Sequence, residues 1–198
     1  MKKLILASQS PRRKALLSQL GYRFSTQVAA IDETPLFNES PKDYVLRLAE
    51  QKARAIFQIL PKQEQKSTVV LGSDTCVIND GNILGKPDDE AQSIIMLEQL
   101  SGSTHQVFTS IAAINNKSII HEVVSTEVYF KPLTLDEIKR YWQTGEPHDK
   151  AGSYAIQGIG GQFVTKINGS YSAVVGLPLY ETSQMLATLG IISPIQEE

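Results

Sequence analysis

The hydrophobic positions along the chain alternate between strand-like runs and helix-like spacings. Continuous apolar runs at residues 4–7 and 68–78 predict strands that are covered on both faces. Residues 104–114 and 118–130 predict two further strands, which the turn 115–117 would join into an antiparallel hairpin. Spacings of three and four residues predict helices at 11–20, 41–60, 88–100 and 135–144, and a last helix that ends near residue 189. We therefore expect a mixed α/β protein.

The first predicted helix carries an unusual set of polar side chains at its N-terminus. Ser10 precedes a proline, the pattern of an N-cap and a first helical residue, and Gly21 ends the helix. Ser8, Arg12 and Arg13 lie at the same end. Free backbone N–H groups and the helix dipole attract anions there and disfavour cations. Two arginines therefore indicate a phosphate or carboxylate site; the alternative is that both are solvated residues of the first turn.

The second predicted helix places a lysine on its apolar face. Lys52 lies four residues after Leu48 and four before Ile56, on the face that should be buried. That face consists of Val45, Leu48, Ala49, Ile56 and Ile59. Two interpretations remain open: the methylene stem of Lys52 packs while its ammonium reaches solvent, or the ammonium points into an anion-filled cleft.

Asp74 is the acidic residue that the hydrophobic pattern singles out. It lies inside the apolar run 68–78, which the motif Gly72-Ser73-Asp74-Thr75 interrupts. Burying an ionised carboxylate without a partner costs several kcal/mol, so Asp74 should be paired, metal-bound or catalytic. Gly72 would allow a bulge or the close approach of another group. The adjacent acids Asp32 and Glu33 become significant if they reach the same point, whereas Cys76 is expected to be core packing.

Two lysines in the second half of the chain also have unusual settings. Lys86 lies between a glycine and a proline, and Lys150 lies near the start of a polar, glycine-rich segment at 149–161. That segment contains Gly158-Ile159-Gly160-Gly161, which lacks the strand-to-helix context of a dinucleotide-binding fingerprint. The chain has no Walker A sequence, so we do not expect a P-loop to hold the anion.

The composition narrows the class of protein. The 198 residues are 41% apolar and carry a formal net charge of −2, which argues against disorder and against a nucleic-acid-binding surface. One cysteine excludes an internal disulfide, and neither a membrane span nor a signal peptide is predicted, so we expect a cytoplasmic protein. No linker divides the chain, although 61–67 predicts a surface loop. The spacing of His105 and His121 does not fit a zinc site.

The candidate residues together form the set that metal-assisted phosphoryl chemistry requires. The cations are Arg12, Arg13, Lys52, Lys86 and Lys150, and the acids are Asp32, Glu33 and Asp74. The cations can hold a polyphosphate at about 1.5–3 kcal/mol per charge-assisted bond. The carboxylates can bind a divalent metal, and one of them can orient or deprotonate a water for in-line attack.

Six blocks of sequence carry a family resemblance. They are Ser8-Gln9-Ser10-Pro11-Arg12-Arg13, Asp32-Glu33, Glu50-Gln51-Lys52-Ala53, Gly72-Ser73-Asp74-Thr75, Gly85-Lys86-Pro87, and Asp149-Lys150-Ala151-Gly152-Ser153-Tyr154 through Gln157-Gly158. In this order they resemble the Maf family of nucleoside triphosphate pyrophosphatases, and they cover nearly the whole chain. Six blocks in register are a far more specific signal than any one of them.

The resemblance implies one domain over residues 1–198, with an elongated α/β fold like that of inosine triphosphate pyrophosphatase. A mixed, curved sheet with flanking helices would form two lobes around a cleft. The implied reaction is hydrolysis between the α and β phosphates of a nucleoside triphosphate with Mg²⁺ or Mn²⁺, which gives a nucleoside monophosphate and pyrophosphate. A homodimer is expected from the resemblance alone.

The resemblance also implies roles for individual residues. The position matching Asp74 is the proton acceptor, and we expect Glu33 and Asp74 to bind the metal. The positions matching Arg13, Lys52 and Lys86 contact the phosphates. Ser8 and Lys150 are expected to bind substrate as well.

Three further positions bear on substrate choice. The branch of the family that resembles dTTP and UTP pyrophosphatases has Arg, Thr and Gln where this chain has Arg12, Thr75 and Gln157, whereas the branch acting on 7-methyl-GTP tends to have Trp, Gln and Glu. A neutral Gln amide can donate to and accept from a uracil or thymine edge, while Glu suits a ring that presents donors or a positive charge.

Other functions remain open at this point. One is a nucleotide-binding regulator without turnover, since the family is associated with septum formation and cell-division arrest. If the protein is an enzyme, its cellular role would be to clear damaged nucleotides from the pool or to slow division. Another is a nucleotidyl transferase, which would need a second substrate. A nucleic-acid-binding regulator is disfavoured by the net charge and by the acids interleaved with the basic positions.

Overall fold

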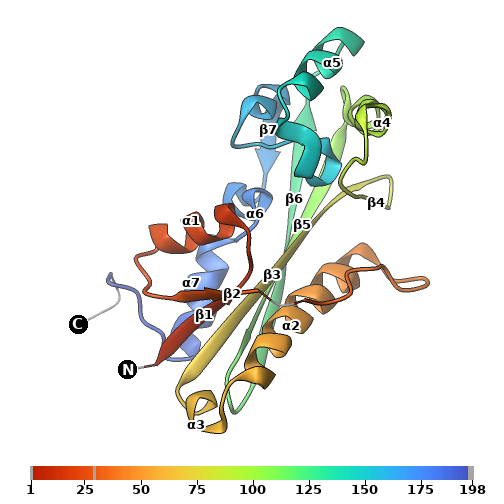
Figure 1. The fold of residues 1–198 in the computed structure, drawn as a ribbon. Coiled ribbons are helices and arrows are strands. Elements are labelled where there is room, and N and C mark those ends of the chain that lie inside the picture. The colour runs from red at the N-terminus through yellow and green to blue at the C-terminus, as the bar shows by residue number, and fades with distance from the viewer. Residues whose placement is uncertain (1, 29, 196–198) are drawn as a thin grey trace. The chain divides into compact units, whose positions relative to one another are not determined.

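A computed structural model describes residues 2–28 and 30–195 of the chain. Seven strands form one sheet in the order β2-β1-β3-β5-β6-β7, with β4 paired to β3 (Figure 1). β1 is parallel to both β2 and β3, whereas β3 with β4 and β6 with β7 are antiparallel. The mixed α/β class expected from the sequence is therefore confirmed.

The chain divides into two compact units. Unit 1 comprises Met1–Thr75, Thr109–Val124 and Gly176–Glu198, and unit 2 comprises Cys76–Phe108 and Ser125–Val175. Strands β3 (Thr68–Asn79), β5 (Thr104–Ile114) and β6 (Ile119–Phe130) contribute residues to both units. A single domain over residues 1–198 stays a prediction.

Unit 1 is built on parallel strands. Its remaining elements are β1 (Lys3–Ala7), α1 (Pro11–Gln19), β2 (Ser25–Gln27), α2 (Pro41–Ile59), α3 (Lys62–Gln65) and α7 (Leu179–Thr188). In Figure 1, α2 lies on one side of β1 and β3, and α1 and α7 lie on the other. Coverage on both sides explains why β3 is buried along almost its whole length, as its apolar sequence predicts.

Gly72 lets α2 approach β3 closely. A Cβ atom at Gly72 would lie 2.2 Å from the carbonyl oxygen of Ala49 and 2.9 Å from the nitrogen of Ala53, so only glycine fits. This confirms that a group approaches Gly72. The strand predicted at 68–78 is also confirmed, because β3 continues through Gly72-Ser73-Asp74-Thr75 although this motif interrupts the apolar run.

Several details of unit 1 differ from the sequence expectations. Ile59 was placed on the buried face of α2 but is 72% exposed, because Leu60 turns inward at the end of the helix. The predicted loop 61–67 contains the short helix α3, and β2 has three exposed residues that give no hydrophobic signal. These differences all occur at short or terminal elements, where packing decides the outcome.

Unit 2 has its own apolar core. Its elements are β4 (Asn82–Leu84), α4 (Glu90–Leu100), α5 (Leu135–Gln143), the 3₁₀ turns η1 (Glu146–Asp149), η2 (Ala151–Ser153) and η3 (Ile159–Phe163), β7 (Val164–Asn168) and α6 (Tyr171–Val175). Phe130, Tyr141, Tyr154 and Phe163 pack at its centre. The turn predicted between residues 114 and 118, which lies in unit 1, is present, since Asn115 N–H donates to Ser118 O at 3.1 Å. Ile95 was expected on an apolar side of α4 but is 55% exposed.

Neither histidine singled out in the sequence lies in a group of potential metal ligands. His105 is buried in unit 2, where its Nε2 lies 2.8 Å from the Tyr154 hydroxyl and burial lowers its pKa to about 4. His121, in unit 1, lies against Glu50, with 2.6 Å between Nδ1 and Oε1. Within residues 2–28 and 30–195, no helix is long and apolar enough to cross a bilayer.

Candidate active site

The loop between β1 and α1 positions an arginine at the start of the helix. Ser10 caps α1, since its hydroxyl accepts from the N–H of Arg13, as the sequence predicts. The Ser8 hydroxyl accepts from the N–H of Ser10 at 3.1 Å, which folds the loop back on itself. The loop thus presents Ser8 and Arg13 on the same side of the helix N-terminus, while Arg12 is half-buried beside them.

Arg13 connects three segments of unit 1. Its Nε donates to Gly176 O at 2.8 Å, Nη2 donates to the Thr75 hydroxyl at 3.2 Å, and Nη1 lies 3.5 Å from the Ser8 hydroxyl. Burial lowers the pKa of the guanidinium, while the negative charge of Asp74 acts in the opposite direction. Arg13 is therefore no solvated first-turn residue, and it faces a carboxylate.

Lys52, Asp74 and Glu33 form a charged cluster in the same unit. The ammonium of Lys52 lies 2.6 Å from Asp74 Oδ1 and 2.8 Å from Glu33 Oε1. Asp74 comes from the middle of β3, Lys52 from the face of α2 that covers β3, and Glu33 from the loop before α2. The two interpretations of Lys52 are thereby resolved: its ammonium points inward to carboxylates and not to solvent.

Burial dominates the ionisation of Asp74. The side chain lies within a strand covered on both faces, and this burial raises the pKa of its carboxyl above the ordinary value. The charges of Lys52 and Arg13 oppose the shift, and Glu33 adds to it. A carboxylate with a raised pKa is suited to accept a proton near neutral pH.

The same carboxylates are suited to a hard divalent cation. Among the described residues, no group of three or more His, Cys, Asp or Glu side chains is placed to hold a metal. Glu33 and Asp74 nevertheless place oxygen atoms within hydrogen-bond distance of one nitrogen, and oxygen is the ligand that Mg²⁺ and Mn²⁺ prefer. Mg²⁺ is commonly bound by one or two carboxylates plus substrate phosphates, so this donor set fits.

Thr75 and its neighbours complete the unit 1 site. The Thr75 hydroxyl lies 3.0 Å from that of Thr109 on β5 and accepts from Arg13. Ser73 donates to Gly176 O at 3.1 Å, the same carbonyl that Arg13 contacts. Cys76 is buried, as expected for core packing. Sequence reasoning missed Thr109 and treated the turn at Gly176 as structural. The only sequence feature that marked this turn was the glycine of Gly176-Leu177-Pro178, which has a φ of +126° in the structure.

The remaining predicted lysines lie in unit 2. Lys86 is exposed and follows Gly85, whose carbonyl accepts from the N–H of Gly152 at 3.0 Å. Lys150 is paired with the carboxylate of Asp149. The contact between Gly85 and Gly152 thus holds the Lys86 loop beside the Lys150 segment, so two cations that are distant in sequence lie on neighbouring segments.

Gln157 lies on a loop whose backbone is hydrogen-bonded to Glu146 and Tyr141. Glu146 accepts from Ile159 N–H at 2.8 Å, from Gly160 N–H at 2.9 Å and from the Tyr141 hydroxyl at 2.7 Å. The Tyr141 hydroxyl in turn accepts from Ala155 N–H at 3.1 Å. Gln157 itself is exposed between these anchored positions. We call Glu146 and Tyr141 the loop scaffold.

The loop scaffold explains the glycines that matched no nucleotide-binding fingerprint. A Cβ at Gly158 would lie 2.0 Å from Glu146 Oε2, and one at Gly160 would lie 2.5 Å from the Tyr141 hydroxyl. Sequence reasoning missed Glu146, although the glycine pattern shows that something approaches the loop. The hydrogen bonds from Gly160, Tyr141 and Ile159 outweigh burial and lower the pKa of Glu146, which keeps it ionised.

Unit 1 therefore places cations from two helices around a buried carboxylate, an arrangement that is suited to binding a polyanion. Comparison with known proteins identifies the family. The model of the Maf-like protein family matches residues 3–189, and the chain belongs to this family.

Several relatives cover the chain almost from end to end. A dTTP/UTP pyrophosphatase of Colwellia psychrerythraea is 60% identical over 193 residues, which are 98% of this chain and 91% of the relative. A dTTP/UTP pyrophosphatase of Vibrio vulnificus is 54% identical over 186 residues, 94% of this chain and 98% of the relative. Among solved structures, the Staphylococcus aureus Ham1 protein is 13% identical with a TM-score of 0.37, covering 69% of this chain and 88% of that one. The Ham1 similarity is too low to support any argument.

Proposed function

We propose that this protein is a dTTP/UTP pyrophosphatase, which hydrolyses a pyrimidine nucleoside triphosphate to the monophosphate and pyrophosphate. Membership of the Maf-like family and the activity for which relatives at 54–60% identity are named support the reaction and the substrates. The observation that carries the proposal is the contact of Lys52 with both Asp74 and Glu33, next to Arg13. Cations that can hold phosphates and carboxylates that can orient a water suit the hydrolysis of a phosphoanhydride.

Asp74 acts as the proton acceptor in this proposal. Its carboxylate orients a water, takes a proton from it, and directs the oxygen at the α phosphorus. A bond forms between the water oxygen and the α phosphorus, the bond from the α phosphorus to the bridging oxygen breaks, and pyrophosphate leaves. The raised pKa of Asp74 makes it a better base than an exposed aspartate, and burial on β3 fixes its position.

The cations hold the triphosphate in this proposal. Arg13 and Lys52 are the cations whose charges act on Asp74, and in this proposal they bind phosphate oxygens, with Ser8 as a neutral hydrogen-bonding partner. When the triphosphate binds, the ammonium of Lys52 gives up part of its contact with Glu33 and Asp74 and contacts a phosphate oxygen instead. Lys86 and Lys150 of unit 2 are assigned to the same substrate by their match to the family blocks.

Glu33 and Asp74 are the residues that would hold Mg²⁺ or Mn²⁺. A metal held there would neutralise part of the charge of the phosphates. Glu33 suits this role because its side chain is 55% exposed and so open to an incoming ion, while its carboxylate already reaches the charged cluster.

Arg12, Thr75 and Gln157 select the base in this proposal. Gln157 is exposed on an anchored loop, and its neutral amide can pair with the donor and acceptor edge of uracil or thymine. Thr75 is already held by Arg13 and Thr109, so its hydroxyl has a fixed position.

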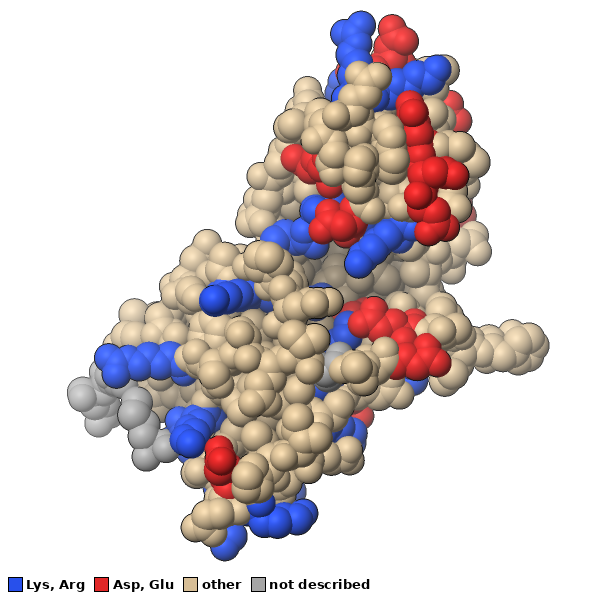
Figure 2. Space-filling view, viewed as in Figure 1, with Lys and Arg blue, Asp and Glu red and all other residues tan. Residues whose placement is uncertain are grey.

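Two other functions remain distinguishable by experiment. A nucleotide sensor without turnover would bind dTTP or UTP and leave it intact, and a nucleotidyl transferase would need a second substrate. Basic and acidic side chains are interspersed on the face shown in Figure 2, so nothing on this face favours nucleic acid. The homodimer, the cytoplasmic location and the roles in nucleotide-pool cleansing or division arrest stay predictions.

The test is to identify the products formed from dTTP with Mg²⁺. Chromatography should find dTMP and pyrophosphate in equal amounts, and hydrolysis in ¹⁸O-labelled water should place the label in dTMP. Orthophosphate with dTDP would mean that a different bond is cleaved. Tight binding of dTTP without product would indicate a sensor.

A further inference from the structure

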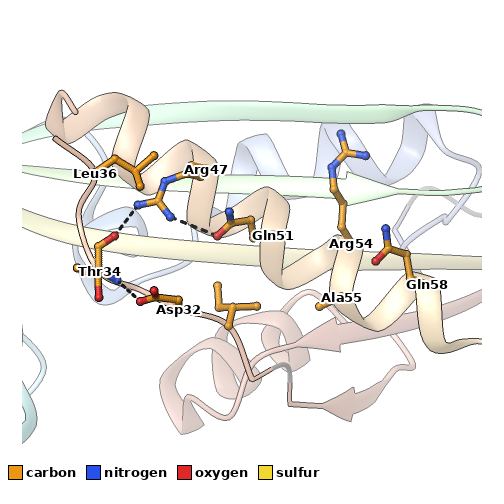
Figure 3. Close-up of a pocket in the computed structure, with 9 residues that line it drawn as sticks. Asp32, Thr34, Leu36, Arg47, Gln51, Arg54, Ala55 and Gln58 are labelled. Atoms are coloured by element: carbon orange, nitrogen blue, oxygen red, sulfur yellow. Dashed lines mark hydrogen bonds between the residues drawn. The ribbon is translucent and has the colours of Figure 1, made fainter. Parts of the chain in front are cut away.

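Arg47 fastens the loop before α2 to the helix itself. Its Nε donates to Glu39 Oε1 at 2.6 Å and its Nη2 donates to Glu39 Oε2 at 2.7 Å, which is a bidentate pair. Nη2 also donates to the carbonyl of Thr34 at 3.1 Å, and Nη1 donates to Gln51 Oε1 at 3.3 Å. Figure 3 shows Arg47 reaching from α2 to Thr34 on the loop on one side and to Gln51 of the same helix on the other. One guanidinium therefore spans loop and helix.

Polar contacts hold this loop where apolar packing is weak. A pocket of about 470 Å³ lies between the loop and α2, with Ile31, Asp32 and Leu36 on the loop side (Figure 3). Leu36 is 58% exposed and Phe37 is 95% exposed, so the tip of the loop buries little apolar surface. Residues 30–39 contain neither helix nor strand. A segment of this kind keeps one conformation only if specific bonds offset the entropy of ordering it.

The fastened loop carries Glu33. Thr34, whose carbonyl Arg47 contacts, is the next residue in the chain, and the Tyr44 hydroxyl donates to the carbonyl of Glu33 at 3.0 Å. The peptide groups on this side of Glu33 are thus tied to α2, the helix that also carries Lys52. Because the Glu33 side chain is more than half exposed, packing does not hold its carboxylate at Lys52. Besides its ion pair with Lys52, the position of its backbone must therefore hold it.

The pair between Arg47 and Glu39 is well suited to this task. The side chains of Arg47 and Glu39 are only 18% and 7% exposed. Their hydrogen bonds lower the pKa of Glu39 and raise that of Arg47, so both stay charged. Glu39 also accepts from the N–H of Leu36 at 3.0 Å, which draws the tip of the loop to the same point.

We propose that Arg47 is a positioning residue for the reaction: by fastening residues 34–39 to α2 it holds the Glu33 carboxylate at Lys52 and Asp74. This role of Arg47 rests on the proposed function, because it requires that Glu33 takes part in the hydrolysis. Arg47 contacts neither Asp74 nor Lys52, so its effect on turnover has to pass through the loop.

Arg47→Ala and the matched control Arg54→Ala test this. Arg54 lies on the same helix and lines the same pocket, but its guanidinium is paired with Glu50 on α2 at 3.4 Å and contacts no loop residue that lines the pocket. Hydrogen exchange of the amides of residues 31–39 should be faster in Arg47→Ala and unchanged in Arg54→Ala. The value of kcat/KM for dTTP should fall about 10- to 100-fold in the first variant and less than about threefold in the second.

A second pair of variants separates positioning from general stability. If Arg47 acts through Glu33, Arg47→Ala should lower the residual rate of Glu33→Ala by less than about threefold, because two residues that act through one group are not additive. Equal losses in both backgrounds would overturn the proposal, as would unchanged exchange in residues 31–39. Should Arg47→Ala fail to fold, Arg47→Lys keeps the charge without the bidentate pair and should show the same pattern at smaller size. If the wild type does not hydrolyse dTTP, the proposed function fails, and the exchange data alone decide whether Arg47 fixes the backbone at Glu33.

Discussion

Asp74 and Glu146 are carboxylates with opposite shifts in pKa. For Asp74, burial in β3 outweighs the neighbouring cations, and the pKa rises. For Glu146, two backbone N–H groups and a phenol outweigh burial, and the pKa falls. Hydrogen bonds from neutral groups hold a carboxylate ionised and in place, whereas burial leaves it ready to take a proton. Asp74 is therefore suited to proton transfer, and Glu146 is suited to fixing the shape of a loop.

The largest expected effect is that of Asp74→Asn. The variant should fold, because burial already disfavours the charge that the substitution removes. Hydrolysis of dTTP should fall about 10²- to 10⁴-fold, the usual contribution of a general base. Pyrophosphate release measures the loss, and a melting curve checks the fold. Asp80→Asn makes the same change at the exposed turn after β3 and should keep full activity; an active Asp74→Asn variant would mean that another group handles the water.

Lys52→Met should alter stability and pH dependence together. It leaves Asp74 with one cation fewer in a buried site, so we expect the free energy of unfolding to fall by about 3 kcal/mol. Since Lys52 lowers the pKa of Asp74, its removal should raise that pKa further, and activity requires the ionised form. The acid limb of the pH profile of kcat/KM should therefore move to higher pH, and the maximal value of kcat/KM should fall. Lys42→Met, exposed on the first turn of α2, is the control, and an unmoved limb would separate Lys52 from the ionisation of Asp74.

Gln157→Glu tests the loop that the scaffold holds. An amide N–H that pairs with a base oxygen is lost, and an unsatisfied polar group costs about 1–3 kcal/mol, so kcat/KM for dTTP and UTP should fall about 10- to 100-fold. The melting temperature should hardly change because Gln157 is exposed. Gln143→Glu, an exposed change at the end of α5, serves as the control. Unchanged turnover in a folded variant would remove Gln157 from substrate selection.

Glu146→Gln should have the smallest effect, and it should concern stability and selectivity more than maximal rate. The amide replaces a charged acceptor of three hydrogen bonds, so we expect a loss of about 1.5 kcal/mol in the free energy of unfolding. A loosened loop should narrow the ratio of kcat/KM between UTP and GTP. Tyr141→Phe, which removes only the hydroxyl, should narrow it less. A ratio that stays constant while the melting temperature falls would limit Glu146 to a structural role.

The sequence predicted features that depend on neighbouring residues. The Ser10 cap and the buried strand around Asp74 follow from local spacing, and Gly72 correctly indicated a close approach. Spacing also placed Lys52 on the covered face of α2, but only the structure shows that its ammonium points to carboxylates. Partners that are distant in sequence could not be predicted: Thr109 reaches Thr75 from another strand, and Gly176 reaches Arg13 across most of the chain. Ile59 and Ile95 were misplaced because spacing alone does not decide which edge of an apolar stripe is covered. The metal ligands and the phosphate contacts stay predictions.

We propose that the charged cluster performs the hydrolysis and that the loop at Gln157 selects the base. Pyrophosphate release from dTTP, UTP, GTP and 7-methyl-GTP, measured with Mg²⁺ for the wild type, Asp74→Asn and Gln157→Glu, tests it most directly. The wild type should favour dTTP and UTP, Asp74→Asn should lose activity on every nucleotide by the same factor, and Gln157→Glu should lose it on dTTP and UTP alone. If Gln157→Glu lost activity on all four nucleotides by the same factor, or if Asp74→Asn kept its activity, these separate roles of the charged cluster and the loop would be contradicted.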